Sequence, residues 1–295
     1  MRAAIDIGSN SALLLVADGD RVVHDECRVV GLGRGMGDPG VFRPDRMQAT
    51  LDALVDYAAR ARDLGVEPNA VRAVATSASR RALNASTFYD RVQRRTGIAV
   101  RVISGDEEAR LTYLGGLAGI TVKPGPVFLC DPGGGSTEII LGEGRDILQR
   151  VSLEIGTVRL TDRYLGYGRV DPAALARARQ EIDRAFLEVD LLRRPRTTIA
   201  VAGSATTLAA ASLGLAAYDP PRVHNSLLTR AQLHDWVDRI LGASPEARRK
   251  LFSASPERAD TMLIGACILL RALEYSQRQS VRISDRGLRY GLLAD

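Results

Sequence analysis

The sequence has little lysine, little cysteine and few aromatic residues, and each shortage narrows the classes of protein to consider. Two of its 40 basic residues are lysine, Lys123 and Lys250, so almost all of its positive charge is arginine. The three cysteines, Cys27, Cys130 and Cys267, are odd in number, far apart and without CxxC spacing. We therefore expect neither a disulfide framework nor a zinc site, and buried thiols in a reducing cytoplasm.

Several sequence features that would mark other kinds of protein are absent. No stretch approaches the roughly 20 apolar residues that span a bilayer. Residues 1–6 contain an acid and lead directly into a predicted strand, which argues against a signal peptide. A Walker A sequence is missing. Aromatic residues make up 5% of the chain and are not interleaved with basic runs, so we expect a cytoplasmic protein with no membrane or nucleic-acid partner.

The overall composition is that of a soluble globular protein with a small excess of positive charge. The 295 residues are 45% hydrophobic and 25% charged, which is enough for two domains with separate cores. The net charge of +5 fits a polyanionic partner without identifying one. Arginine binds phosphate better than lysine does, although a genome rich in G and C would produce the same arginine bias.

A strand–turn–strand pattern occurs twice, about one domain apart. An apolar strand over 3–7 contains Asp6 and is followed by a turn at 8–11, and a strand over 127–131 ends at Asp131 before a turn at 132–136. The two acids are 125 residues apart. Strands alternate with helical patterns between and after these hairpins, which indicates α/β structure. We predict a helix from its N-cap Asp171 to about residue 192, a helix capped by Thr229 and a helix over about 257–277, and we expect the glycine-rich segment 31–37 to be a loop. We therefore predict two duplicated domains, 1–115 and 116–295, with the final helix either in the second domain or packed back on the first.

Both turns have the composition of a phosphate-binding turn. Small residues allow several backbone N–H groups to converge on one anion, and glycine is expected to matter because its φ is free and it has no Cβ to block close approach. An acid just before such a turn would repel phosphate unless a cation lies between them, so Asp6 and Asp131 are predicted to hold Mg²⁺ or its water shell. Two such turns facing one cleft would grip consecutive phosphates. The residues predicted to bind phosphate are Gly8, Ser9, Asn10, Ser11, Gly133, Gly134, Gly135, Ser136 and Thr137.

Three consecutive acids, Asp106, Glu107 and Glu108, begin a predicted helix after the strand at 98–103. One of them would suit a general base that orients water for phosphoanhydride hydrolysis. Acids in the first turn of a helix are also favoured by the helix dipole without any catalysis. The spacing of the residues leaves both interpretations open.

Taken together, these motifs resemble the exopolyphosphatase / guanosine pentaphosphate phosphohydrolase family of the actin–sugar kinase–Hsp70 superfamily, over essentially the whole chain. The resemblance implies two ribonuclease H-like, actin-like ATPase domains with an interdomain cleft. It places the catalytic acid at Glu108, within Ser-Gly-Asp-Glu-Glu-Ala-Arg at 104–110, and Glu138 in the metal and water network. It also implies that Thr76, Ser77 and Arg80 meet substrate phosphate, and it extends to Asn84, Gly156, Arg159, the segment 203–208 and His224.

The activity implied is hydrolysis of the terminal phosphate of inorganic polyphosphate, with Mg²⁺ or Mn²⁺ held by Asp6, Asp131 and Glu138. The chain lacks the C-terminal helical extension of longer relatives, which implies action on shorter polymers. The alternatives are hydrolysis of pppGpp to ppGpp, a non-catalytic nucleotide or polyphosphate sensor, and a sugar or acetate kinase. Family resemblance also implies a homodimer.

Three positions depart from the family pattern. Pro132 replaces an aliphatic residue and removes an N–H donor from the turn. Ala202 and Ser204 stand where glycine and threonine are usual, which weakens the expectation of a nucleoside contact there.

Overall fold

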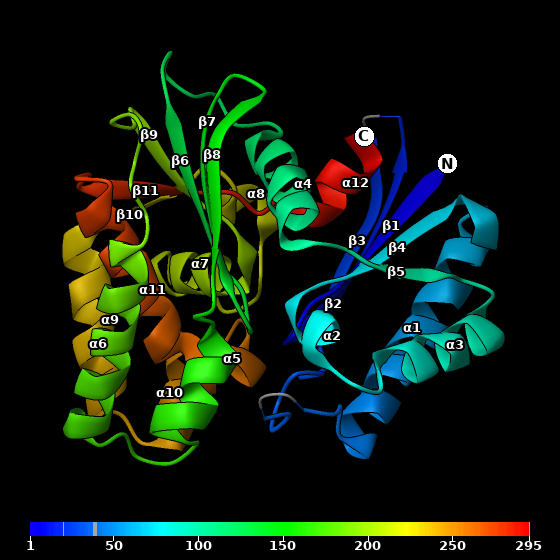
Figure 1. Cartoon of the computed structure of the whole chain (residues 1–295), viewed down its shortest axis with the longest axis horizontal. Helices are drawn as coiled ribbons and strands as arrows, with labels where there is room; N and C mark the ends of the chain where they lie inside the picture. The colour runs from blue at the N-terminus through cyan, green and yellow to red at the C-terminus, as the bar shows by residue number, and fades with distance from the viewer. Residues whose placement is uncertain (20, 38–39, 295) are drawn as a thin grey trace. The chain divides into compact units, whose positions relative to one another are not determined.

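The computed structural model describes residues 1–19, 21–37 and 40–294, and the chain divides into two compact units (Figure 1). Unit 1 contains residues 1–115 together with the C-terminal helix α12 (Leu288–Ala294). Unit 2 runs from residue 116 to residue 287. The range 116–295 predicted for the second domain therefore differs from unit 2 by the helix α12.

Unit 1 is built on a five-stranded mixed sheet with the order β3-β2-β1-β4-β5. Strands β1, β2 and β3 form an antiparallel meander, while β4 and β5 run parallel to β1. The strands are β1 (Arg2–Ile7), β2 (Ser11–Asp18), β3 (Arg21–Val29), β4 (Val71–Ala75) and β5 (Val100–Val102). The strand expected over 98–103 is thus shorter than predicted.

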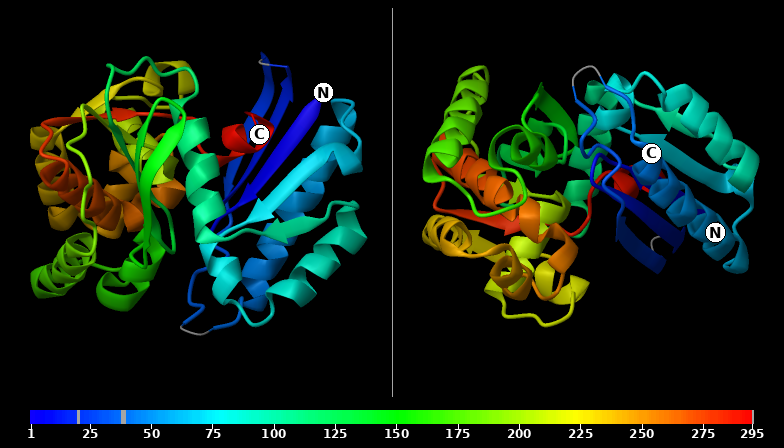
Figure 2. Two further views of the ribbon diagram at one scale, coloured as in Figure 1. Left: turned by 45° about the horizontal axis from the view of Figure 1, so that its top comes forward. Right: turned by 90° about the horizontal axis from the view of Figure 1, so that it is seen from below.

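Helices cover both faces of this sheet because alternate residues of β1 are buried on opposite sides. Helices α1 (Pro44–Asp63) and α3 (Ala85–Thr96) pack against each other and against the face that carries Ile5 and Ile7 (Figures 1 and 2). Helix α12 and the start of α4 (Gly105–Leu117) cover the other face, which carries Ala4. Asp6 belongs to the same alternation as Ala4, so its side chain emerges on the α12 side.

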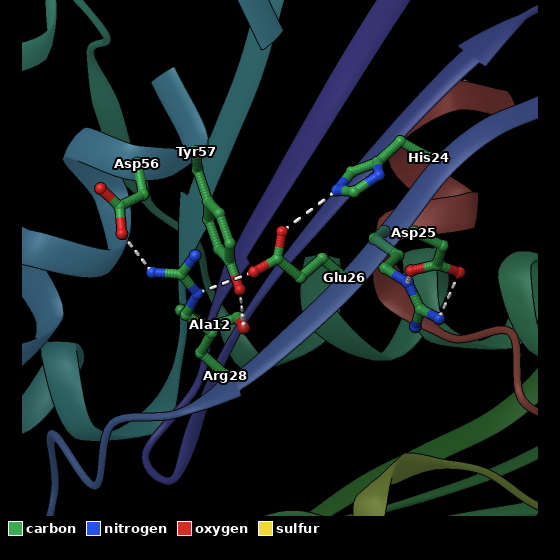
Figure 3. Close-up of polar contacts among 8 residues, drawn as sticks. Ala12, His24, Asp25, Glu26, Arg28, Asp56 and Tyr57 are labelled. Atoms are coloured by element: carbon green, nitrogen blue, oxygen red, sulfur yellow. Dashed lines mark hydrogen bonds and ion pairs between the residues drawn. The ribbon is translucent and has the colours of Figure 1, made fainter. Parts of the chain in front are cut away.

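Polar contacts fix the edge strand β3 on both of its faces (Figure 3). Toward α1, the Glu26 carboxylate accepts from Arg28, and Arg28 forms an ion pair with Asp56. Toward α12, Arg289 donates two hydrogen bonds of 2.8 Å to Asp25. The contact between Arg289 and Asp25 joins the strand to a helix that lies more than 250 residues later in the sequence.

Unit 2 repeats this topology and adds one antiparallel edge strand, β10. Its six-stranded sheet has the order β10-β11-β9-β6-β7-β8; β6, β7 and β8 form the antiparallel meander, and β9 and β11 run parallel to β6. The strands are β6 (Val127–Pro132), β7 (Thr137–Glu143), β8 (Asp146–Leu153), β9 (Thr197–Ala200), β10 (Leu227–Thr229) and β11 (Ser280–Ile283). The predicted α/β fold of two duplicated ribonuclease H-like domains, as in actin-like ATPases, is confirmed.

The core of unit 2 is formed largely by helices packed on this sheet, and α11 is buried along most of its length. The helices of more than two turns are α6 (Pro172–Leu187), α7 (Ala202–Ser212), α9 (Arg230–Gly242) and α11 (Met262–Tyr275). Asp171 and Thr229 cap α6 and α9 as predicted, the latter in a capping box.

Two predicted helix boundaries were wrong. Helix α6 ends at Leu187 and does not continue to about residue 192, because the chain turns to meet the edge strand β8, where Gln149 bonds Asp190 and Leu192. The helix predicted over 257–277 begins as a 3-10 turn, Pro256–Thr261, and becomes α-helical only at Met262.

Among the residues that the structure describes, no helix combines the length and the apolar character needed to cross a bilayer.

Candidate active site

The turn that joins β1 to β2 holds the residues predicted to bind phosphate in unit 1. Gly8 N–H donates to the Ser11 carbonyl at 2.9 Å and closes the turn. Ser9, Asn10 and Ser11 are all less than 10% exposed. Neither Gly8 nor Gly133, the first glycine of the corresponding turn in unit 2, adopts a left-handed conformation. The predicted need for a free φ was therefore wrong at these two positions.

The segment 30–33, which follows β3, donates hydrogen bonds to this turn. The N–H groups of Val30 and Gly31 donate to the Asn10 carbonyl, and Gly33 N–H donates to the Ser9 carbonyl at 2.7 Å. A Cβ at Gly33 would lie 3.1 Å from the Ser9 Cβ, so a side chain there would press on the turn. The glycine-rich segment 31–37 was predicted only as a loop, and the spacing of its glycines is the one sequence signal for this contact.

Asp6, the second-last residue of β1, has an unusual carboxylate. Its Oδ1 is enclosed and has no hydrogen-bond partner among the described residues. Burial and, to a smaller extent, the nearby charge of Glu108 raise the pKa of Asp6 to about 7, against the opposing effect of Arg289. A carboxylate oxygen without a partner fits coordination of a hard divalent cation, which prefers oxygen ligands. Within the described ranges, however, no three metal-ligating side chains gather into a cluster.

Glu108 differs from its two acidic neighbours, Asp106 and Glu107, in burial and in its arginine partner. Asp106 is exposed, and Glu107 makes a two-pronged ion pair with Arg101. Glu108 is 7% exposed, and its Oε2 accepts from Arg80 Nη1 at 2.6 Å. The same Arg80 nitrogen donates to the Ile103 carbonyl. Of the three acids, Glu108 is therefore the enclosed one, and Arg80 fixes it.

Helix α2 (Ser77–Arg81) brings Arg80 to this place. It begins directly after β4, where Thr76 N–H donates to the Ile7 carbonyl at the end of β1. Thr76 and Ser77 are buried beside this strand end. Unit 1 thus gathers the residues predicted from its part of the sequence, which we call the unit 1 site: Asp6, Gly8, Ser9, Asn10, Ser11, Thr76, Ser77, Arg80 and Glu108.

In unit 2, Asp131 and Glu138 lie directly opposite each other on β6 and β7. Glu138 is 1% exposed, and its Oε1 accepts from the hydroxyl groups of Ser136 and Ser152 at 2.7 and 2.9 Å. Pro132 pairs with Thr137 at the end of this ladder. These acids, with the turn between them, form the unit 2 site: Asp131, Gly133, Gly134, Gly135, Ser136, Thr137 and Glu138.

The segment 154–159 wraps around the glycine turn of unit 2. Thr157 N–H donates to the Gly133 carbonyl, and the N–H groups of Val158 and Arg159 donate to the Gly134 carbonyl. A Cβ at Gly156 would lie only 2.4–2.6 Å from backbone atoms of Gly134 and Gly135. Glycine at position 156 is therefore required by close backbone approach, a role that no local sequence pattern specifies.

Two segments with family resemblance lie elsewhere in unit 2. Residues 203–208 belong to α7, which starts where β9 ends. His224 follows the short helix α8 (Pro220–Val223), and its Nδ1 accepts from the Asp285 N–H. Burial and the Arg286 guanidinium lower the pKa of His224. Asn84 lies in unit 1, where its side chain bonds both backbone groups of Phe42.

Comparison with known proteins identifies the family. The family model described as the Ppx/GppA phosphatase family matches residues 15–295. Exopolyphosphatase 2 of Mycobacterium tuberculosis is 36% identical over 287 residues, covering 90% of this chain and 88% of that protein.

Solved structures agree with this relationship. The Ppx/GppA enzyme of Aquifex aeolicus superposes with a TM-score of 0.80 at 34% identity, over 99% of this chain and 97% of that one. An exopolyphosphatase from Cytophaga hutchinsonii gives a TM-score of 0.89 at 25% identity, over 99% and 96%. The chain belongs to the Ppx/GppA phosphatase family and is a phosphatase of the hydrolase class.

Proposed function

We propose that this phosphatase is an exopolyphosphatase that releases orthophosphate from the end of inorganic polyphosphate, with a preference for short chains. The observation that carries the proposal is the enclosed Glu108 carboxylate held by Arg80 in the unit 1 site. The names of the relatives from Mycobacterium tuberculosis and Cytophaga hutchinsonii support the choice of polyphosphate.

Glu108 is the proposed general base. It would orient a water molecule toward the terminal phosphorus and accept its proton while the terminal phosphoanhydride P–O bond breaks. The shortened polymer would leave with the electron pair of that bond. Arg80 contacts Glu108 through one guanidinium nitrogen. Its other N–H groups would donate hydrogen bonds to the phosphoryl oxygens and stabilise their negative charge. The turns at 8–11 and 133–137 would bind phosphate through backbone N–H groups.

Asp6, Asp131 and Glu138 are the proposed holders of Mg²⁺, or of Mn²⁺ in its place. The enclosed Oδ1 of Asp6 supports this assignment most directly. When bound, such an ion would neutralise charge on the phosphate oxygens. Homodimer assembly and a cytoplasmic location also stay predictions.

The first test replaces Glu108 with glutamine. This keeps the shape of the side chain and its contact with Arg80 but removes the base, so phosphate release should fall by a factor on the order of 10² or more. Tripolyphosphate should still bind. Release from Glu108→Gln at the wild-type rate would refute the assigned role.

The second test compares substrates. Phosphate release from short polyphosphate, long polyphosphate and pppGpp, each with Mg²⁺ and with EDTA, distinguishes the proposal from the pppGpp alternative. Fastest release from short polyphosphate, lost in EDTA, is the expected result. Binding of these compounds without any release would favour the sensor alternative.

A further inference from the structure

Arg159 is a basic residue that lies at the glycine turn of the unit 2 site. Its backbone N–H donates to the Gly134 carbonyl at 3.0 Å, so the backbone from which its side chain extends is in direct contact with the turn. It is also the single basic residue in the two segments 131–138 and 154–159, which together make up the turn and the chain that wraps it. These segments carry the acids Asp131 and Glu138.

The Arg159 guanidinium is held by one partner residue. Nη1 donates to the Glu154 carbonyl at 2.9 Å, and Nη2 lies 2.6 Å from the Glu154 carboxylate. The enclosed Nε and Nη2 make no hydrogen bond with any described residue, so the contact of Nη2 with Glu154 is an ion pair without hydrogen-bond geometry. The arginine is therefore fixed through Nη1 by the backbone of the segment that clamps the turn, while its other two nitrogens have no hydrogen-bond acceptor.

The two side chains of this ion pair differ strongly in exposure. The arginine side chain is 17% exposed, whereas that of Glu154 is 63% exposed. A carboxylate in such contact with water contributes little to an ion pair, because water competes for its charge. Arginine binds phosphate oxygens in a bidentate manner and loses little hydration in doing so. A phosphate group can therefore replace the Glu154 carboxylate at small cost.

We propose that Arg159 is a phosphate-binding residue of the unit 2 site, and that Glu154 occupies its guanidinium until a phosphate group displaces it. The ligand class is an inorganic polyphosphate or another phosphoanhydride chain, which deepens the proposed function and rests on it. The glycine turn supplies backbone N–H groups to the phosphate chain. Arg159 supplies a positive charge to a site whose other charged side chains, Asp131 and Glu138, are acids.

The test measures binding separately from hydrolysis. Calorimetric titration of tripolyphosphate, with Mg²⁺ present, into protein carrying Glu108→Gln gives an affinity without turnover. Adding Arg159→Gln should weaken that affinity about tenfold or more, the effect of losing one or two charge-assisted hydrogen bonds. The matched control is Arg163→Gln, four residues later in the π-helical turn Thr161–Leu165, where an exposed arginine pairs with Glu181; it should leave affinity unchanged.

Glu154→Gln distinguishes phosphate binding from a purely structural ion pair. If Glu154 competes with phosphate, its neutral replacement should tighten tripolyphosphate binding severalfold. If the pair merely braces the turn, the same variant should weaken binding. Urea unfolding midpoints within the range of the Arg163→Gln control show that each variant is folded.

The possible results separate this inference from the proposed function. Arg159→Gln affinity equal to that of the control, weaker binding in Glu154→Gln, or no tripolyphosphate binding to the parent protein would each overturn the inference. Arg159-dependent binding in a wild-type protein that releases no phosphate would refute the exopolyphosphatase proposal and uphold the role of Arg159.

Discussion

Asp6 occupies a place where burial makes its negative charge unfavourable. Its folded pKa of about 7 lies well above the value of about 3.9 for an aspartate in an unfolded chain. Between these values the folded protein binds more protons than the unfolded chain does. The free energy of unfolding should therefore fall as the pH rises from about 4 to about 7 in the absence of divalent ions.

Asp6→Asn tests this charge penalty. Asparagine has no charge to bury, so at pH 8 in EDTA the variant should be more stable than the wild type, by about 2–4 kcal/mol at most. Urea unfolding at pH 5 and pH 8 measures the difference. Mg²⁺ should raise wild-type stability at pH 8 and have much less effect on the variant. The same loss of stability with pH in both proteins would contradict the explanation.

The start of helix α7 has a backbone conformation that favours the glycine usual in the family. Ala202, which stands where glycine is usual, has a φ of +66° at the start of α7. This left-handed conformation costs an L-residue about 1 kcal/mol or more and costs glycine almost nothing. The usual glycine is thus explained by the sharp transition from β9 into α7, and this chain makes the same turn at higher cost.

Ala202→Gly should therefore stabilise the protein, by up to about 1 kcal/mol after the greater flexibility of glycine in the unfolded chain is counted. Ala211→Gly is the matched control, because Ala211 lies in the last turn of the same helix and should lose about 1 kcal/mol. Denaturant unfolding of both variants measures the effect. Equal destabilisation by the two glycines would show that position 202 carries no strain.

Local patterns predicted the two hairpins and their acids, because strand alternation and small turn residues are encoded within a few neighbouring positions. They did not predict that residues 30–33 bond to the turn at 8–11, or that the backbone of Gly156 lies so close to Gly134 that no side chain fits there. Those contacts join segments about 20 residues apart, so they depend on how the strands are paired. The strand β8 and the early end of α6 were missed for a related reason: Gln149 of β8 bonds the chain just beyond α6.

The catalytic assignment of Glu108 shows the same division. Spacing alone left three acids equivalent, and the structure separates them by burial and by their arginine partners. The family resemblance supplied the choice in advance. The roles assigned to the site residues in catalysis and metal binding stay predictions for the experiments above.

Considered as a whole, the molecule has one continuous unit and one unit made from both ends of the chain. Leu288, Leu292 and Leu293 of α12 complete a core with Ala4 and Leu15. A Cβ at Gly291 would lie 2.0 Å from the Leu111 carbonyl oxygen, so the helix packs closely on the middle of α4. The sheet that carries Asp6 is therefore covered on one face by the last helix described.

Leu292→Ala tests how much unit 1 depends on α12. Removing this buried side chain should lower the free energy of unfolding by about 2–5 kcal/mol through lost burial and the cavity left behind. Leu187→Ala, at a side chain that is 76% exposed, is the control and should change it by less than about 0.5 kcal/mol. Urea unfolding, with hydrogen exchange of the β1 amides, provides the measurement. Equal effects of the two substitutions would mean that α12 is dispensable for unit 1.

The return of α12 to the first sheet sets an order of events during translation. Residues 116–287 contain all of unit 2, whereas the core that residues 1–115 form with α12 lacks the helix until residues 288–294 have been made. The segment made first is thus finished last. A chain that ends before position 288 would carry the glycine turn and Arg159 in a unit with all its segments, but its Asp6 would lie on a sheet whose α12-side apolar face is covered only by α4 and is otherwise exposed to water and to aggregation.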